Sequence, residues 1–361
     1  MNLLNKILTL FIPLFVLFYM QANAQRVKMY VGTYTDQSTS KGVYIYDLNT
    51  KSGDVTLVNT IEMSNPSFLA RKGNILYAVN EDAEGMLTVY DLKANQVLSH
   101  VSTGGAHPCH IALSPGLPIA IVSNYSSGSF ALFSLNEDGS IKAMEESQKF
   151  EDVGLDKARQ SQSHIHSAFF TRDGKGVFIS NLGGDKIYEY EILENKDRYS
   201  LKLKNEIQVK PGGGPRHLVL SNNQNTIYSM LELTGEVQVL QRENEKWVSK
   251  QIIAMYPDGF QGEHGGADIK MSKDGKFIYA TNRGTANFVY AYHIQHNGLL
   301  TLKGSNSVFG DSPRNINISP DGKFIMVSNQ LTNNISLFTM SNLFQEPKAS
   351  IDIPKPVCVI F

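Results

Sequence analysis

Short apolar strands separated by polar turns recur along nearly the whole chain. One copy, IALSPGLPIAIVSNYSSGSFALFSL from Ile111, has an apolar strand, a polar turn, a second apolar strand ending near an Asn, another turn, and a third strand. Five further copies follow this order, and a shorter one, MYVGTYTDQSTSKGVYIYDL from Met29, precedes them. Short apolar runs bounded by turn residues are typical of β-strands, and helical periodicity is hard to find in this part of the chain. The pattern predicts an all-β protein.

The copies align on the residue that ends the second strand of each. This position falls at Thr33, Asn80, Asn124, Asn181, Leu231, Asn282 and Asn329, in steps of 47, 44, 57, 50, 51 and 47 residues. Repeats of about 40 to 50 residues are typical of β-propeller blades. Seven copies therefore predict a seven-bladed β-propeller, a single domain over residues 25–361. We expect the repeated Asn side chains to cap turns rather than to bind a ligand.

The two ends of the repeat region complement each other. The first copy lacks the initial strand of the unit, whereas the last residues, KPVCVIF, resemble an isolated initial strand. We therefore predict that the C-terminal strand completes the first blade and closes the ring, which removes open sheet edges. The assignment of strands also agrees with the turns between them: SPDG and the related SKDG and TRDG fit tight turns, because Pro fixes φ and Gly tolerates the left-handed region.

The first residues have the features of an export signal. A Lys in MNLLNK precedes an apolar run of 14 residues, ILTLFIPLFVLFYM, and an A-x-A site at Ala22–Ala24 follows. This predicts a signal peptide over residues 1–24, cleaved before Gln25, and a mature protein that is periplasmic or secreted and not held in a membrane. The alternative is a membrane anchor, which the shortness of the run disfavours.

Composition narrows the classes of partner. Lys plus Arg is 33 and Asp plus Glu is 34, so the formal charge is −1. A near-neutral chain without a basic run has no electrostatic footprint for nucleic acid, so we expect the partner to be a small molecule or another protein.

Cys109 and Cys358 are predicted to be buried and unpaired rather than joined in a disulfide. No His/Cys/Asp cluster has metal-ligand spacing, so neither a metal nor another cofactor is expected.

Blade topology predicts where polar residues meet. The first strand of a blade lines the centre and the second returns to the face where the first began. Residues that precede the first strands are Cys109–His110, His166–Ser167, Arg216–His217, Ala267–Asp268 and Arg314–Asn315. Those that follow the second strands are Tyr34, Glu81, Tyr125, Leu182, Glu232, Arg283 and Gln330. Because desolvated charges are costly unless paired or used, this cluster predicts a site for a small anionic ligand.

The arginines of this cluster favour phosphate or carboxylate, which guanidinium groups bind bidentately. The alternative is structural: Arg216 could pair with Glu232 and hold two blades together. The segment EDVGLDKARQSQ, residues 151–162, is interpreted as a longer loop over a blade edge or the mouth of the site. Three histidines outside the cluster fall in predicted loops or strand ends, and we interpret them as surface residues: His264, His293 and His296.

Several of these motifs together resemble the seven-bladed propeller lactonases. They are GAHPCHIALSP, SHIHSAFFTRDG, GPRHLVLS, GADIKMSKDG, TNRG and SPRNINISPDGKF, and the resemblance extends from about Val27 to the end of the chain. This family includes propeller-type 6-phosphogluconolactonases and fungal carboxy-cis,cis-muconate cyclases. The resemblance implies hydrolysis of 6-phospho-D-glucono-1,5-lactone to 6-phosphogluconate without a redox cofactor. The active residues that it implies are His166, Arg216, Glu232 and Arg283, with His110, His217 and Arg314 nearby.

These residue types suit a metal-free hydrolysis. Either Glu232 or His166 takes a proton from water, and the choice between them stays open. Arg216 or His217 stabilises the oxyanion. A nucleophilic Ser is disfavoured because no G-x-S-x-G elbow is present. The residues expected to bind the substrate are Arg283 and Arg314, which hold its phosphate or carboxylate, with His110, Asp268 and Asn315.

Two departures from the family bear on the substrate. Leu231 stands where relatives tend to carry Asn, and the leader directs the protein out of the compartment in which phosphogluconolactone is made. An unphosphorylated sugar lactone is therefore an alternative substrate, because fold does not fix substrate. Two rival functions are a muconate-type lactone cycloisomerase and an exported binding propeller without enzymatic activity.

Overall fold

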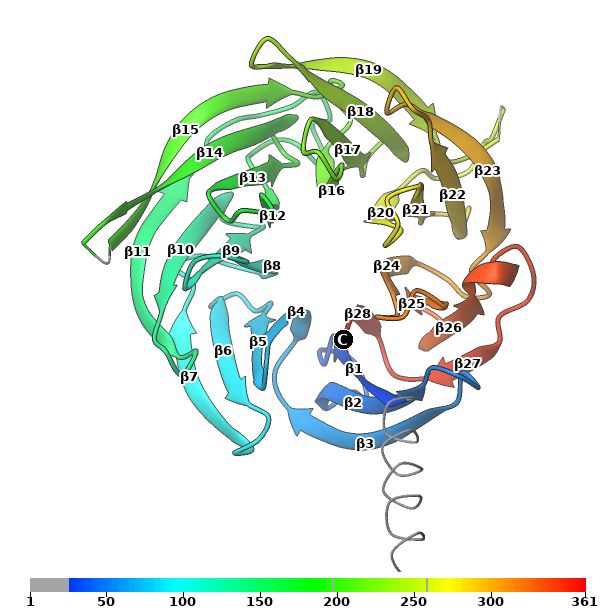
Figure 1. The fold of residues 1–361 in the computed structure, drawn as a ribbon, viewed down its shortest axis with the longest axis horizontal. Coiled ribbons are helices and arrows are strands. Elements are labelled where there is room, and N and C mark those ends of the chain that lie inside the picture. Colours follow the sequence, from blue (N-terminus) through cyan, green and yellow to red (C-terminus); the bar gives the residue numbers. More distant parts are fainter. Residues whose placement is uncertain (1–25, 197, 258) are drawn as a thin grey trace, which may run out of the picture.

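The structure is a computed structural model that describes residues 26–196, 198–257 and 259–361. Its strands form seven four-stranded sheets arranged in a ring (Figure 1). The prediction of an all-β, seven-bladed propeller is confirmed. The expected leader, residues 1–24, lies outside the described residues. Within the described ranges, no helix is both long and apolar enough to cross a bilayer. A 3-10 helix, η1 (Met340–Asn342), follows strand β26 (Asn334–Thr339).

Each blade has four strands that lie side by side, in order from the centre of the ring to its outer edge (Figure 1). The innermost strands are β28 (Pro356–Ile360), β4 (Pro66–Lys72), β8 (Pro108–Leu113), β12 (Ile165–Phe170), β16 (Pro215–Leu220), β20 (Gly266–Met271) and β24 (Pro313–Ile318). The second strands are β1 (Arg26–Thr33), β5 (Ile75–Asn80), β9 (Ile119–Asn124), β13 (Gly176–Asn181), β17 (Thr226–Leu231), β21 (Phe277–Asn282) and β25 (Phe324–Asn329).

The two outer strands of each blade complete the list. The third strands are β2 (Gly42–Asn49), β6 (Met86–Asp91), β10 (Ser129–Leu135), β14 (Lys186–Asn195), β18 (Glu236–Glu243), β22 (Phe288–Ile294) and β26 (Asn334–Thr339). The outermost strands are β3 (Val55–Glu62), β7 (Gln96–Ser102), β11 (Ile141–Lys149), β15 (Arg198–Gln208), β19 (Lys246–Ala254), β23 (Leu300–Ser307) and β27 (Ala349–Asp352).

The ring closes as the two ends of the chain predict. Strand β28 pairs antiparallel with β1, and Val31 lies opposite Val359. The first blade thus has the order β28-β1-β2-β3, with strands from both ends of the chain. Cys358 is fully buried in β28 and Cys109 is almost fully buried, and both are free thiols. The prediction of two buried, unpaired cysteines is confirmed.

Apolar side chains from neighbouring blades pack together between the sheets. Ile121 and Phe130 of one blade, for example, share a buried cluster with Ile165, Ile179 and Tyr190 of the next. Burying such a side chain contributes about 1.5 to 3 kcal/mol. The blades therefore form a rigid frame that fixes the residues at the strand ends.

The SPDG turn has the expected structure, but four of the repeated Asn residues differ from the expectation that they cap turns. Asn80, Asn124, Asn282 and Asn329 each donate to a carbonyl that follows the outermost strand of the preceding blade. In the SPDG turn, Gly322 has φ 75° and its N–H donates to the carbonyl of Ser319 at 2.8 Å. Asn124 Nδ2 donates to the carbonyl of Thr103, which follows the outermost strand of the preceding blade, at 3.2 Å. Leu231, at the equivalent position of its own blade, is instead fully buried in an apolar cluster.

Candidate active site

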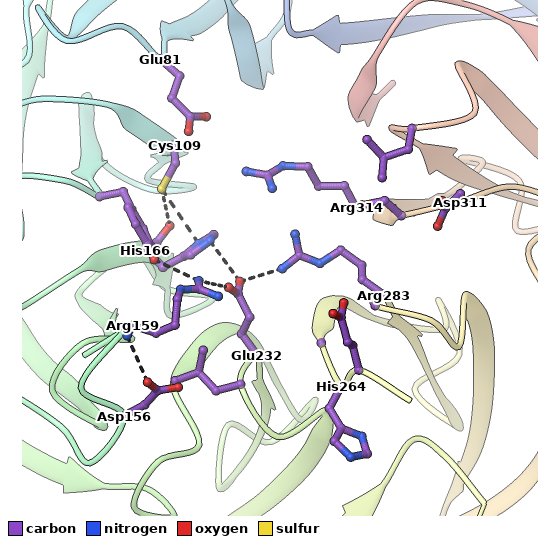
Figure 2. A pocket seen from close by; sticks show the side chains of 17 residues that line it. Glu81, Cys109, Asp156, Arg159, His166, Glu232, His264, Arg283, Asp311 and Arg314 are labelled. Carbon is purple, nitrogen blue, oxygen red and sulfur yellow. Dashed lines mark hydrogen bonds and ion pairs between the residues drawn. The ribbon is translucent and has the colours of Figure 1, made fainter. Parts of the chain in front are cut away.

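A pocket of about 1070 Å³ opens at the face where the first strands begin and the second strands end. Its lining is rich in charged side chains, which Figure 2 shows pointing toward one another from different blades. The titratable residues among them include Glu81, Cys109, Asp156, Arg159, His166, Glu232, Glu263, His264, Arg283, Asp311 and Arg314.

Three arginines surround the carboxylate of Glu232, which directly follows β17. Arg159 Nη2 lies 2.6 Å from Oε1, whereas Arg216 Nε and Arg283 Nη2 lie 2.9 and 3.0 Å from Oε2. His166 Nε2 lies 3.9 Å from the same Oε2. In Figure 2, Arg159 and Arg283 approach the carboxylate from opposite sides. The fold thus brings together four residues singled out from the sequence and adds Arg159.

The environment of Glu232 and His166 sets their charges. Burial alone would raise the pKa of the Glu232 carboxyl, but the charges of Arg283, Arg216 and Arg159 outweigh it and lower the pKa to about 2. Burial, and after it the charge of Arg216, lowers the pKa of His166 well below its ordinary value. At neutral pH the site therefore holds an ionised carboxylate beside a neutral imidazole.

Arg314, at the start of β24, has a different environment. Its Nη2 donates to the hydroxyl of Tyr34 at 2.8 Å, and this hydroxyl donates to Glu81 Oε2 at 2.8 Å. Among the described residues, no carboxylate lies within ion-pair distance of Arg314, and Figure 2 shows its guanidinium extending into the pocket. Arg314 is therefore a cation that a ligand in the pocket can reach without displacing an acid.

A second polar network lies behind the lining of the pocket and is centred on the fully buried Asp268. Its Oδ1 lies 2.8 Å from His217 Nδ1, and its Oδ2 accepts from Asn315 Nδ2 at 2.6 Å. Lys270 Nζ lies 3.0 Å from both oxygens. Burial alone would raise the pKa of Asp268, but the charge of Lys270 and the contact with His217 hold it well below its usual range. The His217 ring packs 5.3 Å from that of His110.

Neither Arg216 nor His217 lines the pocket, although one or the other was expected to stabilise an oxyanion. Arg216 is 3% exposed, and its Nη1 donates to the carbonyl of Ala267 in the next blade. The ion pair with Glu232 lies within one blade, because both residues belong to the β16–β17 unit. Arg216 joins its blade to both neighbours by other contacts: the hydrogen bond to the Ala267 carbonyl, and the one that its own carbonyl accepts from Ser167 Oγ at 2.6 Å.

Comparison with known proteins identifies the family to which this chain belongs. The family model described as "Lactonase, 7-bladed beta-propeller" matches residues 28–361. The chain belongs to this family. A protein of Formosa agariphila named 6-phosphogluconolactonase is 34% identical over 326 residues, which are 86% of this chain and 91% of the relative.

Two solved structures are similar to this propeller lactonase over nearly its whole length. A putative 6-phosphogluconolactonase of Bacteroides fragilis is 31% identical with a TM-score of 0.85, and covers 93% of this chain and 98% of its own. A periplasmic gluconolactonase of Pseudomonas aeruginosa is 30% identical with a TM-score of 0.86, and covers 92% of this chain and 98% of its own. The resemblance seen in the motifs is thereby confirmed.

In this family member, the loop over residues 151–162 reaches the mouth of the pocket and supplies Arg159. The loop is held by Gln160, which is fully buried and whose Nε2 donates to the Leu182 carbonyl at 2.8 Å and to Asp185 Oδ1 at 2.7 Å. Sequence reasoning missed Arg159. The signal that could have found it is the long step of 57 residues between the aligned Asn positions of two blades.

Asp185 also ties this loop to the glycine-rich turn that precedes Arg216. Its Oδ2 accepts from the N–H of Gly212 at 2.7 Å and its Oδ1 from that of Gly214 at 2.8 Å. Both glycines are in the left-handed region, at φ 76° and 65°, which other residues adopt at a cost. One buried carboxylate therefore positions the elements that carry both Arg159 and Arg216.

The rim of the pocket is more acidic than the sequence suggested. Glu81, Asp156, Glu263 and Asp311 contribute to the lining in addition to Glu232. His264 is exposed, as expected, but it also lines the rim. In the described part of the chain, no group of three or more His, Cys, Asp or Glu side chains is arranged to bind a metal ion.

Proposed function

We propose that this chain hydrolyses a sugar δ-lactone, with 6-phospho-D-glucono-1,5-lactone as substrate and 6-phosphogluconate as product. The observation that carries the proposal is one pocket that holds an ionised Glu232, a neutral His166 and the guanidinium of Arg314, which forms no ion pair with a carboxylate of the described residues. Lactone hydrolysis needs a proton acceptor for water and a positive group at the carbonyl oxygen. The names of the relatives support the same reaction class.

His166 is the better candidate for the general base. Both oxygens of Glu232 are engaged by arginines, whereas the imidazole of His166 is neutral and borders the pocket. In the proposed step, a water molecule attacks the lactone carbonyl as His166 takes its proton. The negative charge of Glu232, 3.9 Å from Nε2, stabilises the imidazolium that forms. The imidazolium then returns the proton to the ring oxygen as the C–O bond breaks.

Arg314 is the candidate for oxyanion stabilisation, in place of the buried Arg216 and His217. Its guanidinium lies in the pocket and has no carboxylate to neutralise it within ion-pair distance among the described residues. A well-placed donor to a developing oxyanion contributes about 3 kcal/mol. Arg216 and Arg283 would then hold Glu232 in place, and Asp268, Asn315, His217 and His110 would support the site from behind.

The location of the protein bears on its substrate. We propose export, because residues 1–24 have the pattern of a signal peptide and a structural relative is described as a periplasmic gluconolactonase. Gluconolactone is therefore the second candidate substrate. A muconate-type cycloisomerase reaction remains the alternative chemistry, since the same arginines suit a dicarboxylate.

The test is hydrolysis of freshly made 6-phosphogluconolactone and of gluconolactone by residues 25–361, with spontaneous opening subtracted. We expect turnover by the wild type, and a fall of about 100- to 10,000-fold in kcat for His166→Asn. Arg172→Ala is the control, because Arg172 is exposed in the turn after β12, away from the pocket. Absence of turnover on both lactones would refute the proposal and make muconates, and then binding partners, the next ligands to assay.

A further inference from the structure

We propose that Arg159, supplied by the loop over residues 151–162, receives the anionic group of the substrate and determines preference for a phosphorylated over an unphosphorylated lactone. This inference rests on the proposed function. It concerns a residue outside the strand-end positions that make up the rest of the site.

Arg159 has the most solvent-exposed side chain of the three arginines around Glu232. It is 46% exposed, whereas Arg283 is 17% and Arg216 is 3% exposed. Arg159 alone binds Oε1, while the other two bind Oε2. If Arg159 turns to a ligand, Glu232 therefore keeps two charged partners and is not left as a bare buried charge.

The charges favour such an exchange. Among the described groups in direct contact, three guanidinium groups face the single carboxylate of Glu232, and the acids of the rim form no ion pair with these arginines, so a phosphate group at this cluster would meet an excess of positive charge. Arg159 gives up one carboxylate oxygen and gains phosphate oxygens, and guanidinium binds both through charge-assisted hydrogen bonds. The exchange also removes one cation from Glu232, so its negative charge acts more strongly on the His166 imidazolium during the reaction.

The geometry separates this role from that of Arg314. The phosphate is carried on an arm outside the lactone ring, several bonds from the carbonyl carbon, so one cation cannot serve both groups. Arg314 enters from β24 and Arg159 from the 151–162 loop, with the Glu232 carboxylate between Arg159 and Arg283 (Figure 2). The Tyr125 hydroxyl, 3.2 Å from Arg159 Nη2, is an anchor for this side chain at the pocket wall.

Hydrogen bonds within the loop hold the backbone that carries Arg159. Asp156 Oδ1 accepts from the N–H groups of Ala158 and Arg159, at 2.9 and 3.2 Å, and its own N–H donates to the buried Gln160 at 3.0 Å. The loop is therefore a fixed platform, and the exchange needs only a rotation of the Arg159 side chain. Pre-organisation of this kind is what makes a single side chain an effective specificity determinant.

The experiment compares kcat and KM on 6-phosphogluconolactone and gluconolactone for wild type, Arg159→Ala, Arg159→Lys and Lys157→Ala. Lys157 is the matched control, because it is an exposed cation on the same loop that does not line the pocket. For Arg159→Ala we expect KM for the phosphorylated lactone to rise about 10- to 100-fold, the range for losing a charged hydrogen bond, and the ratio of kcat/KM for the phosphorylated lactone to kcat/KM for gluconolactone to fall by a similar factor. Arg159→Lys should recover part of the loss.

Calorimetric titration with inorganic phosphate separates failure of this inference from failure of the proposed function. We expect the wild type and Lys157→Ala to bind phosphate and Arg159→Ala to bind it at least about 10-fold more weakly. An unchanged ratio of the two lactones in Arg159→Ala would overturn the inference and leave the lactonase proposal intact. If the wild type hydrolyses neither lactone, the proposed function fails, and equal phosphate binding by wild type and Arg159→Ala would then refute the anion site as well.

Discussion

Arg216 Nε lies 2.9 Å from Glu232 Oε2, and both side chains are almost fully buried. A buried ion pair contributes little net stability when it forms, but removal of one partner strands the other charge in a medium of low polarity. In this protein the same arginine also donates to the carbonyl of Ala267 and so joins two blades. The pair is therefore both part of the site and part of the frame.

Arg216→Met should lower the free energy of unfolding by about 1 to 3 kcal/mol, because it removes one of the three cations around the buried Glu232 carboxylate, with Arg159 and Arg283 remaining, and takes the Arg216 donor away from the Ala267 carbonyl. Urea unfolding, followed through the single Trp at position 247, measures the change. The matched control is Arg172→Met, which removes an exposed arginine and should shift the curve little. Equal unfolding curves for the two variants would contradict this account.

Glu232 should make the folded protein sensitive to acid. Its pKa is lowered from an ordinary 4.5 to about 2 in the folded state, so its contribution to stability is fully present above pH 4.5 and is lost as pH falls toward 2. The free energy of unfolding of the wild type should therefore fall more steeply over this range than that of Glu232→Gln. Parallel curves for the two proteins between pH 4.5 and 2 would show that Glu232 has no such role.

The fold followed from the sequence because each blade repeats the same order of strands and because the terminal segments complement each other. The site followed in part for the same reason: topology alone brings the residues at the start of β12 and directly after β17 to one face, so His166 and Glu232 could be identified. The burial of each side chain, and so whether it lines the pocket or lies behind it, was harder to predict. Arg216 and His217 are adjacent in the chain near the start of β16, yet both are buried behind the pocket lining rather than in contact with it.

Arg159 shows why the remainder could not be predicted. It belongs to no strand, and its position depends on hydrogen bonds of Gln160 with Leu182 and Asp185, residues more than twenty positions away in the chain. No periodic pattern encodes such contacts. The unusual length of the connection marked an insertion but not which of its residues points into the pocket.

The buried network behind the pocket should matter for stability more than a surface carboxylate does. Asp268→Asn keeps the shape of the side chain but removes the charge that Lys270 and His217 contact. We expect the free energy of unfolding to fall by about 2 to 3 kcal/mol, measured by urea unfolding. Asp274→Asn, in the exposed SKDG turn, is the control and should change it by less than about 0.5 kcal/mol. A similar effect of both substitutions would mean that the network contributes nothing specific.

Gln160 should control the order of the loop that carries Arg159. Gln160→Leu removes the two hydrogen bonds from Nε2, to the Leu182 carbonyl and Asp185, and the one that Oε1 accepts from the N–H of Asp156, so the loop loses three of its attachments. Trypsin should then cut after Lys157 or Arg159 at least about 10-fold faster, because cleavage tracks the population of the opened loop. Gln162→Leu is the control, since Gln162 is exposed and its amide donates a single hydrogen bond, to Ser126. If the two variants are cut at the same rate, the loop is held by other contacts and the platform for Arg159 does not depend on Gln160.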